Sequence, residues 1–268
     1  MHRSSLSRHS VPWLLALVAL IICVPAIAEA ISFTSSFQVD LTLSDPDLPG
    51  GGVFKGQSGP SDQPVLNVAV SDVETTTSAR TLSAQSSVSA TVSLNGGGIS
   101  SGGAAQVDGR VDPVGPNTGS LTFGAFGHAS FQLNFMSDAN PMMVDISAML
   151  HRSGALWAGL DSSLIDLSCN PFVAAGICAA GGERTDGFPA GDFPFEFHGT
   201  MPPDTEFRFA ILAEVNLFSF SGLNFNRQTT SESQITWNLQ ARPIPAPPTY
   251  LLFGLGIIGL AIANWRRG

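Results

Sequence analysis

Residues 207–215 are Phe-Arg-Phe-Ala-Ile-Leu-Ala-Glu-Val. Apolar side chains occupy every second position of this stretch, which is the period of a β-strand with one buried face. The same alternation recurs along residues 33–43, 66–70, 88–94, 121–135, 144–150, 193–197 and 235–239. Glycine and proline separate these stretches, as they do between strands. The sequence therefore predicts an all-β fold, an antiparallel β-sandwich of jelly-roll-like type.

Helical period is missing from nearly all of this part of the chain. Residues 148–160 alone approach it, so we do not expect the crossover helices of a parallel α/β fold. Residues 45–64 are rich in Gly, Pro and Asp, and residues 95–105 are almost entirely Gly, Ser and Ala, so both are expected to be surface loops. The Ser and Thr of residues 71–94 predict the polar face of two strands, with an O-glycosylated surface as the alternative.

The composition excludes some classes of protein. Charged residues make up 12% of the 268 residues, about half the share in an ordinary globular chain. Hydrophobic residues make up 44%, which is too many for a disordered polyelectrolyte. The net charge is −9 and Lys55 is the single lysine, whereas a nucleic-acid-binding protein needs a cationic face. No nucleic-acid partner is expected.

The first 30 residues have the three parts of a secretory signal peptide. Arg3 and Arg8 supply the positive start, and an apolar segment follows. Ala28 and Ala30 flank Glu29 in a small-x-small cleavage site. We therefore expect an N-terminal signal helix at residues 1–30, export by the Sec route, and cleavage after Ala30. An uncleaved N-terminal anchor is the alternative.

The last residues, 243–268, also have three parts. A proline-rich box is followed by the uncharged apolar run 250–263 and then by the arginine pair Arg266 and Arg267. The run predicts a C-terminal transmembrane helix, and the arginines favour the cytoplasmic side. The box comprises Ile244, Pro245, Ala246, Pro247, Pro248 and Thr249.

This tail resembles the PEP-CTERM sorting signal of Gram-negative bacteria, which joins a Val-Pro-Glu-Pro-Ser/Thr box, a Gly-rich apolar helix and an arginine cluster. The resemblance covers roughly the last 25 residues. Ala246 stands where the family has Glu, and one extra proline precedes Thr249. The resemblance implies processing by an exosortase-type cysteine transpeptidase and transient anchoring in the inner membrane, with the domain in the periplasm. Release or attachment at the cell surface would follow, and family members often accompany exopolysaccharide and biofilm genes.

Removing both ends leaves residues 31–242 as the exported domain. The ends contain one acidic residue, Glu29, and four basic ones, so the charge of the domain becomes −12. Cys169 and Cys178 are the two cysteines of this domain, and an oxidising compartment predicts a disulfide between them. Their spacing fits neither a C-x-x-C redox motif nor a zinc site.

Catalytic constellations are weakly represented in the domain. Its histidines are His128, His151 and His198, and no G-x-S-x-G or S-x-x-K motif accompanies them. A secreted hydrolase is therefore the least favoured function. Paired carboxylates could serve glycosidic cleavage, and four carboxylates are candidates, although their spacing alone gives no geometry. They are Asp192, Glu196, Asp204 and Glu206.

Ligand-binding residues are equally sparse. Asp45 and Asp47 are weak candidates for calcium ligands, although they do not fit an EF-hand loop. Sugars usually stack on Trp or Tyr, and the domain has no Tyr. Trp237 alternates inward with apolar neighbours, which leaves Trp157 as a platform for a ligand. No cofactor is expected other than calcium.

The sequence thus favours an exported, transiently membrane-anchored surface or extracellular-matrix protein of a Gram-negative bacterium. It is expected to be non-enzymatic and linked to exopolysaccharide and biofilm, with an exosortase-type enzyme, the inner membrane and exopolysaccharide as partners. A carbohydrate-binding module, with or without calcium, is the alternative.

Overall fold

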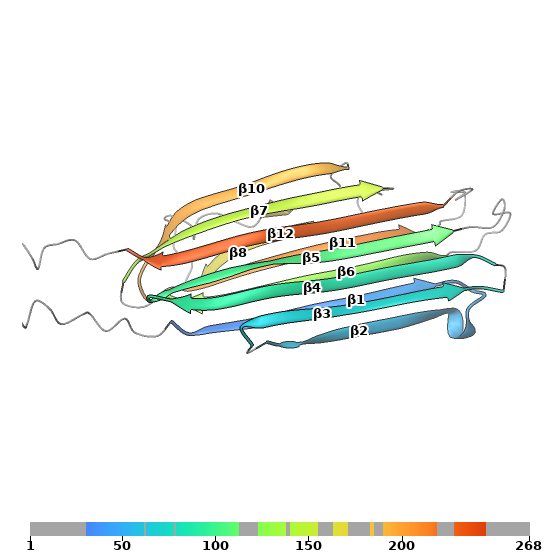
Figure 1. Cartoon of the computed structure of the whole chain (residues 1–268), viewed down its shortest axis with the longest axis horizontal. Helices are drawn as coiled ribbons and strands as arrows, with labels where there is room; N and C mark the ends of the chain where they lie inside the picture. Colours follow the sequence, from blue (N-terminus) through green and yellow to red (C-terminus); the bar gives the residue numbers. More distant parts are fainter. Residues whose placement is uncertain are drawn as a thin grey trace, which may run out of the picture. The chain divides into compact units, whose positions relative to one another are not determined.

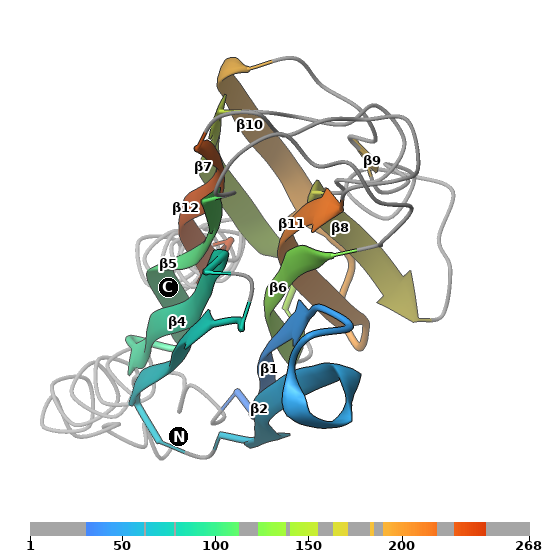
Figure 2. The same cartoon turned by 90° about the vertical axis from the view of Figure 1, so that its right-hand side faces the viewer.

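Two antiparallel sheets of six strands each lie face to face (Figures 1 and 2). The computed structural model describes residues 31–61, 63–77, 79–112, 123–137, 140–154, 163–170, 183–184, 190–218 and 228–244. All described strands belong to one unit, Ala30–Ile244. The prediction of an all-β fold built from antiparallel sheets is confirmed.

The first sheet, sheet A, has the order β2-β1-β6-β11-β8-β9. A short 3-10 helix, η1 (Pro49–Gly51), connects β1 to β2. The strands in this order are β2 (Gly52–Pro60), β1 (Phe33–Ser44), β6 (Gly124–Met136), β11 (Glu206–Phe218), β8 (Ser163–Asn170) and β9 (Glu183–Arg184).

The second sheet, sheet B, has the order β10-β7-β12-β5-β4-β3. Three of its four inner strands, β12, β5 and β4, have 15 residues each, and its edges are β10 and β3. The strands in this order are β10 (Gly191–Met201), β7 (Met142–Gly154), β12 (Thr229–Pro243), β5 (Gly98–Asp112), β4 (Thr81–Asn95) and β3 (Val65–Thr75).

The stretch at residues 207–215 forms most of β11, and its alternation divides the strand as predicted. All five apolar side chains at its odd positions are buried between the sheets, at 0–1% exposure. Arg208 and Leu212 point to the other side and are exposed and half-buried, respectively. Period-two sequence therefore becomes one buried face and one outer face.

Aromatic rings join the two sheets at the centre of the interior. Trp237 of β12 in sheet B stacks on Phe131 of β6 in sheet A, with ring centroids 5.2 Å apart. Phe209 of β11 lies 6.3 Å from the same Trp237 ring. The indole N–H donates to Oγ of Ser101 at 3.3 Å, so the polar atom of the ring is satisfied. The inward position predicted for Trp237 is confirmed.

The expectation of a loop over residues 95–105 is wrong. Gly96 and Gly97 form a tight turn with positive φ, and the chain then enters β5, a central strand of sheet B. A Cβ at Gly103 would lie 2.7 Å from two atoms of the Trp237 indole. The small side chains of this segment make room for the tryptophan, which is a packing role that composition alone does not distinguish from a flexible loop.

Two other expectations also fail. Residues 52–60, inside the region predicted as a loop, form β2 at the edge of sheet A, where glycine and proline are tolerated. The helical tendency of residues 148–160 is overridden as far as Gly154, because β7 pairs with β10 up to Arg152 and with β12 up to Gly154. Among the described residues, no helix has the length and apolar character needed to cross a membrane.

The two predicted targeting segments lie almost entirely outside the described residues. The structure does not describe residues 1–30, which include Ala28 and Ala30. It also does not describe residues 245–268, which include the arginine pair. Of the proline-rich box, Ile244 is described, and its N–H donates to the carbonyl oxygen of Pro141 at 2.8 Å. The signal peptide, the sorting tail and the transmembrane helix stay predictions.

Candidate functional site

The outer face of sheet B is a broad surface rich in hydroxyl and amide side chains, with some exposed apolar ones among them: Val65, Val73, Met143 and Met149. Along β12, Thr236 and Asn238 point outward on either side of the buried Trp237. Along β4, alternate residues of a Ser- and Thr-rich sequence do the same, which confirms the polar face predicted for residues 71–94. We call the outward side chains of β3, β4, β5, β12, β7 and β10 the polar face. Its hydrogen-bonding members include Ser71, Gln85, Ser87, Thr91, Gln106, Ser147, Gln234, Thr236, Asn238 and Gln240.

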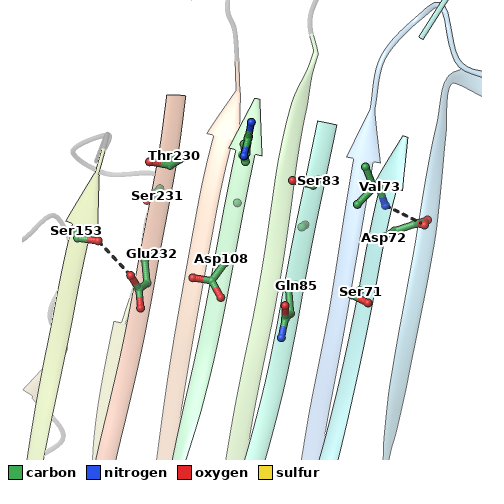
Figure 3. Close-up of a pocket in the computed structure, with 13 residues that line it drawn as sticks. Ser71, Asp72, Val73, Ser83, Gln85, Asp108, Ser153, Thr230, Ser231 and Glu232 are labelled. Carbon is green, nitrogen blue, oxygen red and sulfur yellow. Dashed lines mark hydrogen bonds between the residues drawn. The ribbon is translucent and has the colours of Figure 1, made fainter. Parts of the chain in front are cut away.

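One hollow of about 370 Å³ crosses five strands of the polar face (Figure 3). Strand pairing aligns its side chains into a row, because residues opposite each other in neighbouring strands share a face. From β3 to β7 this row consists of Ser71, Gln85, Asp108, Glu232 and Ser153.

Two carboxylates of this row are direct neighbours. Asp108 of β5 and Glu232 of β12 are paired residues in the ladder. The pKa of Asp108 is raised above its ordinary value, because burial disfavours the charged carboxylate and the negative charge of Glu232 adds to the effect. Nε2 of Gln106 donates to Asp108 at 3.1 Å, and Oγ of Ser153 donates to Glu232 at 3.3 Å. Neutral donors thus offset part of the repulsion.

Two further hollows of about 340 and 360 Å³ lie farther along β12, β7 and β10. They share Ser147, Glu196 and Asn238, so they adjoin each other on the polar face. Thr236 lines the first of them and Gln240 the second. The arrangement offers hydrogen-bond donors and acceptors in a line along the strand. Glu196 borders both hollows, and Asp145 and His198 border the second.

Two histidine–carboxylate pairs connect β7 with the edge strand β10. Nδ1 of His151 donates to Oδ1 of Asp192 at 2.5 Å, and this hydrogen bond raises the pKa of the imidazole. Nδ1 of His198 donates to Oδ1 of Asp145 at 3.0 Å. Arg242 also donates to Asp145, at 2.7 Å, and these hydrogen bonds lower the pKa of its carboxyl group. Both pairs are exposed, so solvent screens them.

The histidines expected in a hydrolase are placed on two different faces. His151 and His198 lie on the polar face, whereas His128 lies on the outer face of sheet A. Nε2 of His128 is 3.2 Å from Oγ of Ser130, and strand pairing puts Asp40 and Glu214 on either side of it. The described residues therefore do not bring the three histidines together.

The carboxylates considered for glycosidic cleavage are also dispersed. Asp192 and Glu196 lie on β10 of sheet B, on the polar face. Asp204 lies in the turn after β10 with a φ of 52°, and Glu206 begins β11 of sheet A. The separation of these elements leaves Asp192 and Glu196 as the two that share a surface.

Asp45 and Asp47, the weak calcium candidates, are bound by an arginine. Arg80 donates from Nε and Nη2 to the two oxygens of Asp45 at 2.8 and 2.7 Å, and from Nη2 to Asp47 at 2.8 Å. Asp45 is fully buried, and the guanidinium also lies 5.1 Å from the ring centre of Phe123. A cation already occupies the space that calcium would take. The ion pairs join the β1–β2 corner of sheet A to the β3–β4 turn of sheet B.

Two sequence predictions fall partly or wholly outside the described residues. Trp157 and Cys178 both lie outside the described residues. The backbone of Cys169 is described in β8, opposite Phe207 of β11. The disulfide and the tryptophan platform stay predictions.

Sequence reasoning missed Arg80 and Phe54. Arg80 lies 35 residues from Asp45, so no local spacing connects them. Phe54 is 69% exposed on β2, whereas Phe207 and Phe209 of β11 are fully buried. Its glycine-rich surroundings, which lack alternating apolar neighbours, are the signal that separates it from the buried phenylalanines.

The described residues contain no group of three or more His, Cys, Asp or Glu side chains placed to hold a metal ion. No family model and no curated protein matches the chain. A solved structure of the Gx strain of infectious bursal disease virus is 12% identical, with a TM-score of 0.16. The match covers 80% of this chain and 63% of that chain, which is less than two thirds of its length. At this TM-score the likeness carries no argument.

Proposed function

We propose that this protein is an exported, transiently membrane-anchored surface or extracellular-matrix protein of a Gram-negative bacterium, without enzymatic activity and linked to exopolysaccharide. Its exported domain would be a jelly-roll-like sandwich of residues 31–242. The signal peptide would direct Sec export. The tail would hold the domain in the periplasm until an exosortase-type enzyme processes it.

The single observation that carries the non-enzymatic part is the dispersal of the reactive side chains. His128 lies on one outer face, and His151 and His198 lie on the other in exposed ion pairs with carboxylates. A hydrolytic triad needs nucleophile, base and carboxylate to converge on one reacting atom. Extended polar surfaces suit binding better than they suit acyl or glycosyl transfer.

Cell fractionation, with mass spectrometry of both termini, tests the proposed localisation and processing. We expect a mature N-terminus at Ile31, recovery from the inner membrane and the cell exterior, and a released form that ends within residues 243–249. The variant Arg266→Ala/Arg267→Ala should accumulate less of the anchored form, and a matched Arg110→Ala variant in the domain should not. An intact Met1 in a cytosolic fraction would contradict the proposal.

Carbohydrate binding is the second candidate function, and the polar face favours it. Three adjoining or neighbouring hollows of 340–370 Å³ combine hydroxyl, amide and carboxylate groups with apolar side chains such as Val73 and Met149. Such groups exchange hydrogen bonds readily with the hydroxyls of a sugar chain. The charge of −12 on the domain would repel polyanions, so a neutral polysaccharide is the favoured ligand.

Affinity electrophoresis of the mature protein tests this candidate. Gels containing dextran or a soluble β-glucan should retard it, and alginate, a polyanion, should not. Calcium should make no difference, because Arg80 occupies the carboxylates that were candidates for the ion. Retardation by alginate alone, or by none of the three polymers, would remove the candidate.

A further inference from the structure

Phe54 is the most exposed large apolar side chain of the described residues, at 69%. It lies on β2, at the edge of sheet A (Figure 1). Its neighbour Lys55 points toward sheet B, where Nζ lies 2.8 Å from Oδ1 of Asp72. Because successive side chains alternate, Phe54 and Gly56 face outward from sheet A.

The ring of Phe54 lies along its own strand. A Cβ at Gly56 would be 3.1 Å from Cζ of Phe54 and 3.1 Å from Cβ of Asp40. The ring therefore covers Gly56, borders Asp40, and presents its other side to solvent. Glycine permits this position, because any side chain at residue 56 would lift the ring away from the sheet.

Polar side chains border the ring on the neighbouring strand. Thr42 of β1 is the ladder partner of Phe54, and Asp40 is the partner of Gly56. Asp40 is 7% exposed, and its Oδ2 accepts a hydrogen bond from Nε2 of Gln38 at 2.7 Å. His128 of β6 follows Asp40 in the same row. A flat apolar surface thus adjoins a line of hydrogen-bonding groups.

From this juxtaposition we infer that Phe54 and the row beside it bind a neutral pyranose ring. A pyranose has an apolar face of C–H groups that packs on an aromatic ring, and hydroxyls at its edge that reach polar neighbours. A lipid chain would need continuous apolar surface, yet Gly56, Asp40 and Thr42 adjoin the ring. A nucleotide would bring phosphates toward Asp40 in a domain of charge −12.

This site lies on the sheet opposite the polar face, and it rests on the proposed carbohydrate binding for the choice of ligand class. A protein with a sugar site on each outer face would connect separate polysaccharide chains, which is what a matrix component needs.

Calorimetric titration of the mature protein with neutral glucose hexamers, α-linked and β-linked, tests the inference. Phe54→Ala should weaken binding of one hexamer by about fivefold or more, since a stacking contact contributes roughly that factor. Phe54→Trp should keep or tighten binding, because its larger ring retains the platform. Leu94→Ala removes another exposed apolar side chain, at 46%, from sheet B, away from the three hollows, and should leave affinity unchanged.

Unchanged affinity in Phe54→Ala would overturn the inference, as would the absence of any heat with either hexamer. A polar-face variant, Thr236→Ala/Asn238→Ala/Gln240→Ala, separates the two proposals. Suppose that the polar-face variant loses polysaccharide retardation while Phe54→Ala binds the hexamers as tightly as wild type. This result would support binding at the polar face and reject the Phe54 site. Weaker hexamer binding in Phe54→Ala, with polysaccharide retardation unchanged in the polar-face variant, would keep the Phe54 site and reject the polar face.

Discussion

The interior of the sandwich and the polar face are built from the same strands, one residue apart. Trp237 stacks on Phe131 between the sheets, while Thr236 and Asn238 on either side of it line hollows on the outside. The interior is aromatic and closely packed, and the polar face is hydroxylated and open. Neighbouring positions of one strand can therefore serve stability and binding separately. Substitutions at inward residues should change the free energy of unfolding, and substitutions at adjacent outward residues should change binding.

The largest contrast is expected within β12. Trp237→Ala removes a ring that contacts both sheets and should lower the free energy of unfolding by ~3–5 kcal/mol. Asn238→Ala changes an exposed side chain and should change it by about 0.5 kcal/mol or less. Urea unfolding of the mature protein followed by near-UV circular dichroism measures both. Equal losses in the two variants would contradict the division of the strand.

The buried ion pairs should follow in size. Asp45→Asn leaves Arg80 without its bidentate carboxylate in a buried corner and should cost about 3 kcal/mol. The matched variant Asp145→Asn makes the same chemical change in an exposed pair and should cost about 0.5 kcal/mol. Thermal unfolding distinguishes them. If millimolar calcium stabilised wild type but not Asp45→Asn, the result would instead support a calcium site at Asp45 and Asp47.

Two adjacent glycines of β5 sharpen the comparison further. A methyl group at Gly103 meets the Trp237 indole and the carbonyl oxygen of Ser89, so Gly103→Ala should cost about 1–3 kcal/mol. At Gly102 the nearest atom is the Trp237 carbonyl oxygen at 3.4 Å, an ordinary contact, and Gly102→Ala should be nearly neutral. Unfolding midpoints in urea compare the two. A neutral Gly103→Ala would mean that the indole does not lie against this strand.

The smallest effect concerns pH on the polar face. His151 has a raised pKa, so its pair with Asp192 stabilises below the ordinary imidazole pKa and is lost as pH rises through the raised value. Asp145 has a lowered pKa, so its pairs stabilise above the ordinary carboxyl pKa and are lost as pH falls through the lowered value. The two pairs together should therefore contribute most between about pH 4 and 6.5.

Because both pairs are exposed, each should contribute about 0.5 kcal/mol or less. Unfolding midpoints measured across this pH range, with His151→Gln as the comparison, test the sign. His151→Gln should remove the decline on the alkaline side and leave the acidic side unchanged. A decline of the same size in His151→Gln would show that other groups cause it.

Much of the fold follows from the sequence because burial between two sheets imposes a period of two. Residues 207–215 and Trp237 obey it, and their positions are as predicted. Residues 95–105 do not, because a central strand that faces a large indole needs small side chains, and Gly and Ser carry no hydrophobic period. Composition therefore predicted a loop where packing makes a strand.

The candidate site was less predictable, because it depends on side chains brought together across strands. The two carboxylates at Asp45 and Asp47 suggested calcium, and the guanidinium that neutralises them comes from Arg80, beyond any local motif. The row through Asp108 and Glu232 exists only after the register of β5 and β12 is fixed. Sequence indicated hydroxyl-rich strands, and the ladder determined which of their members are neighbours.

The most direct test of the polar face as a binding surface replaces three outward residues of one strand. Thr236→Ala/Asn238→Ala/Gln240→Ala should keep the unfolding midpoint of the mature protein and abolish its retardation in gels that contain dextran or soluble β-glucan. A midpoint equal to wild type together with undiminished retardation would contradict the assignment of binding to the polar face.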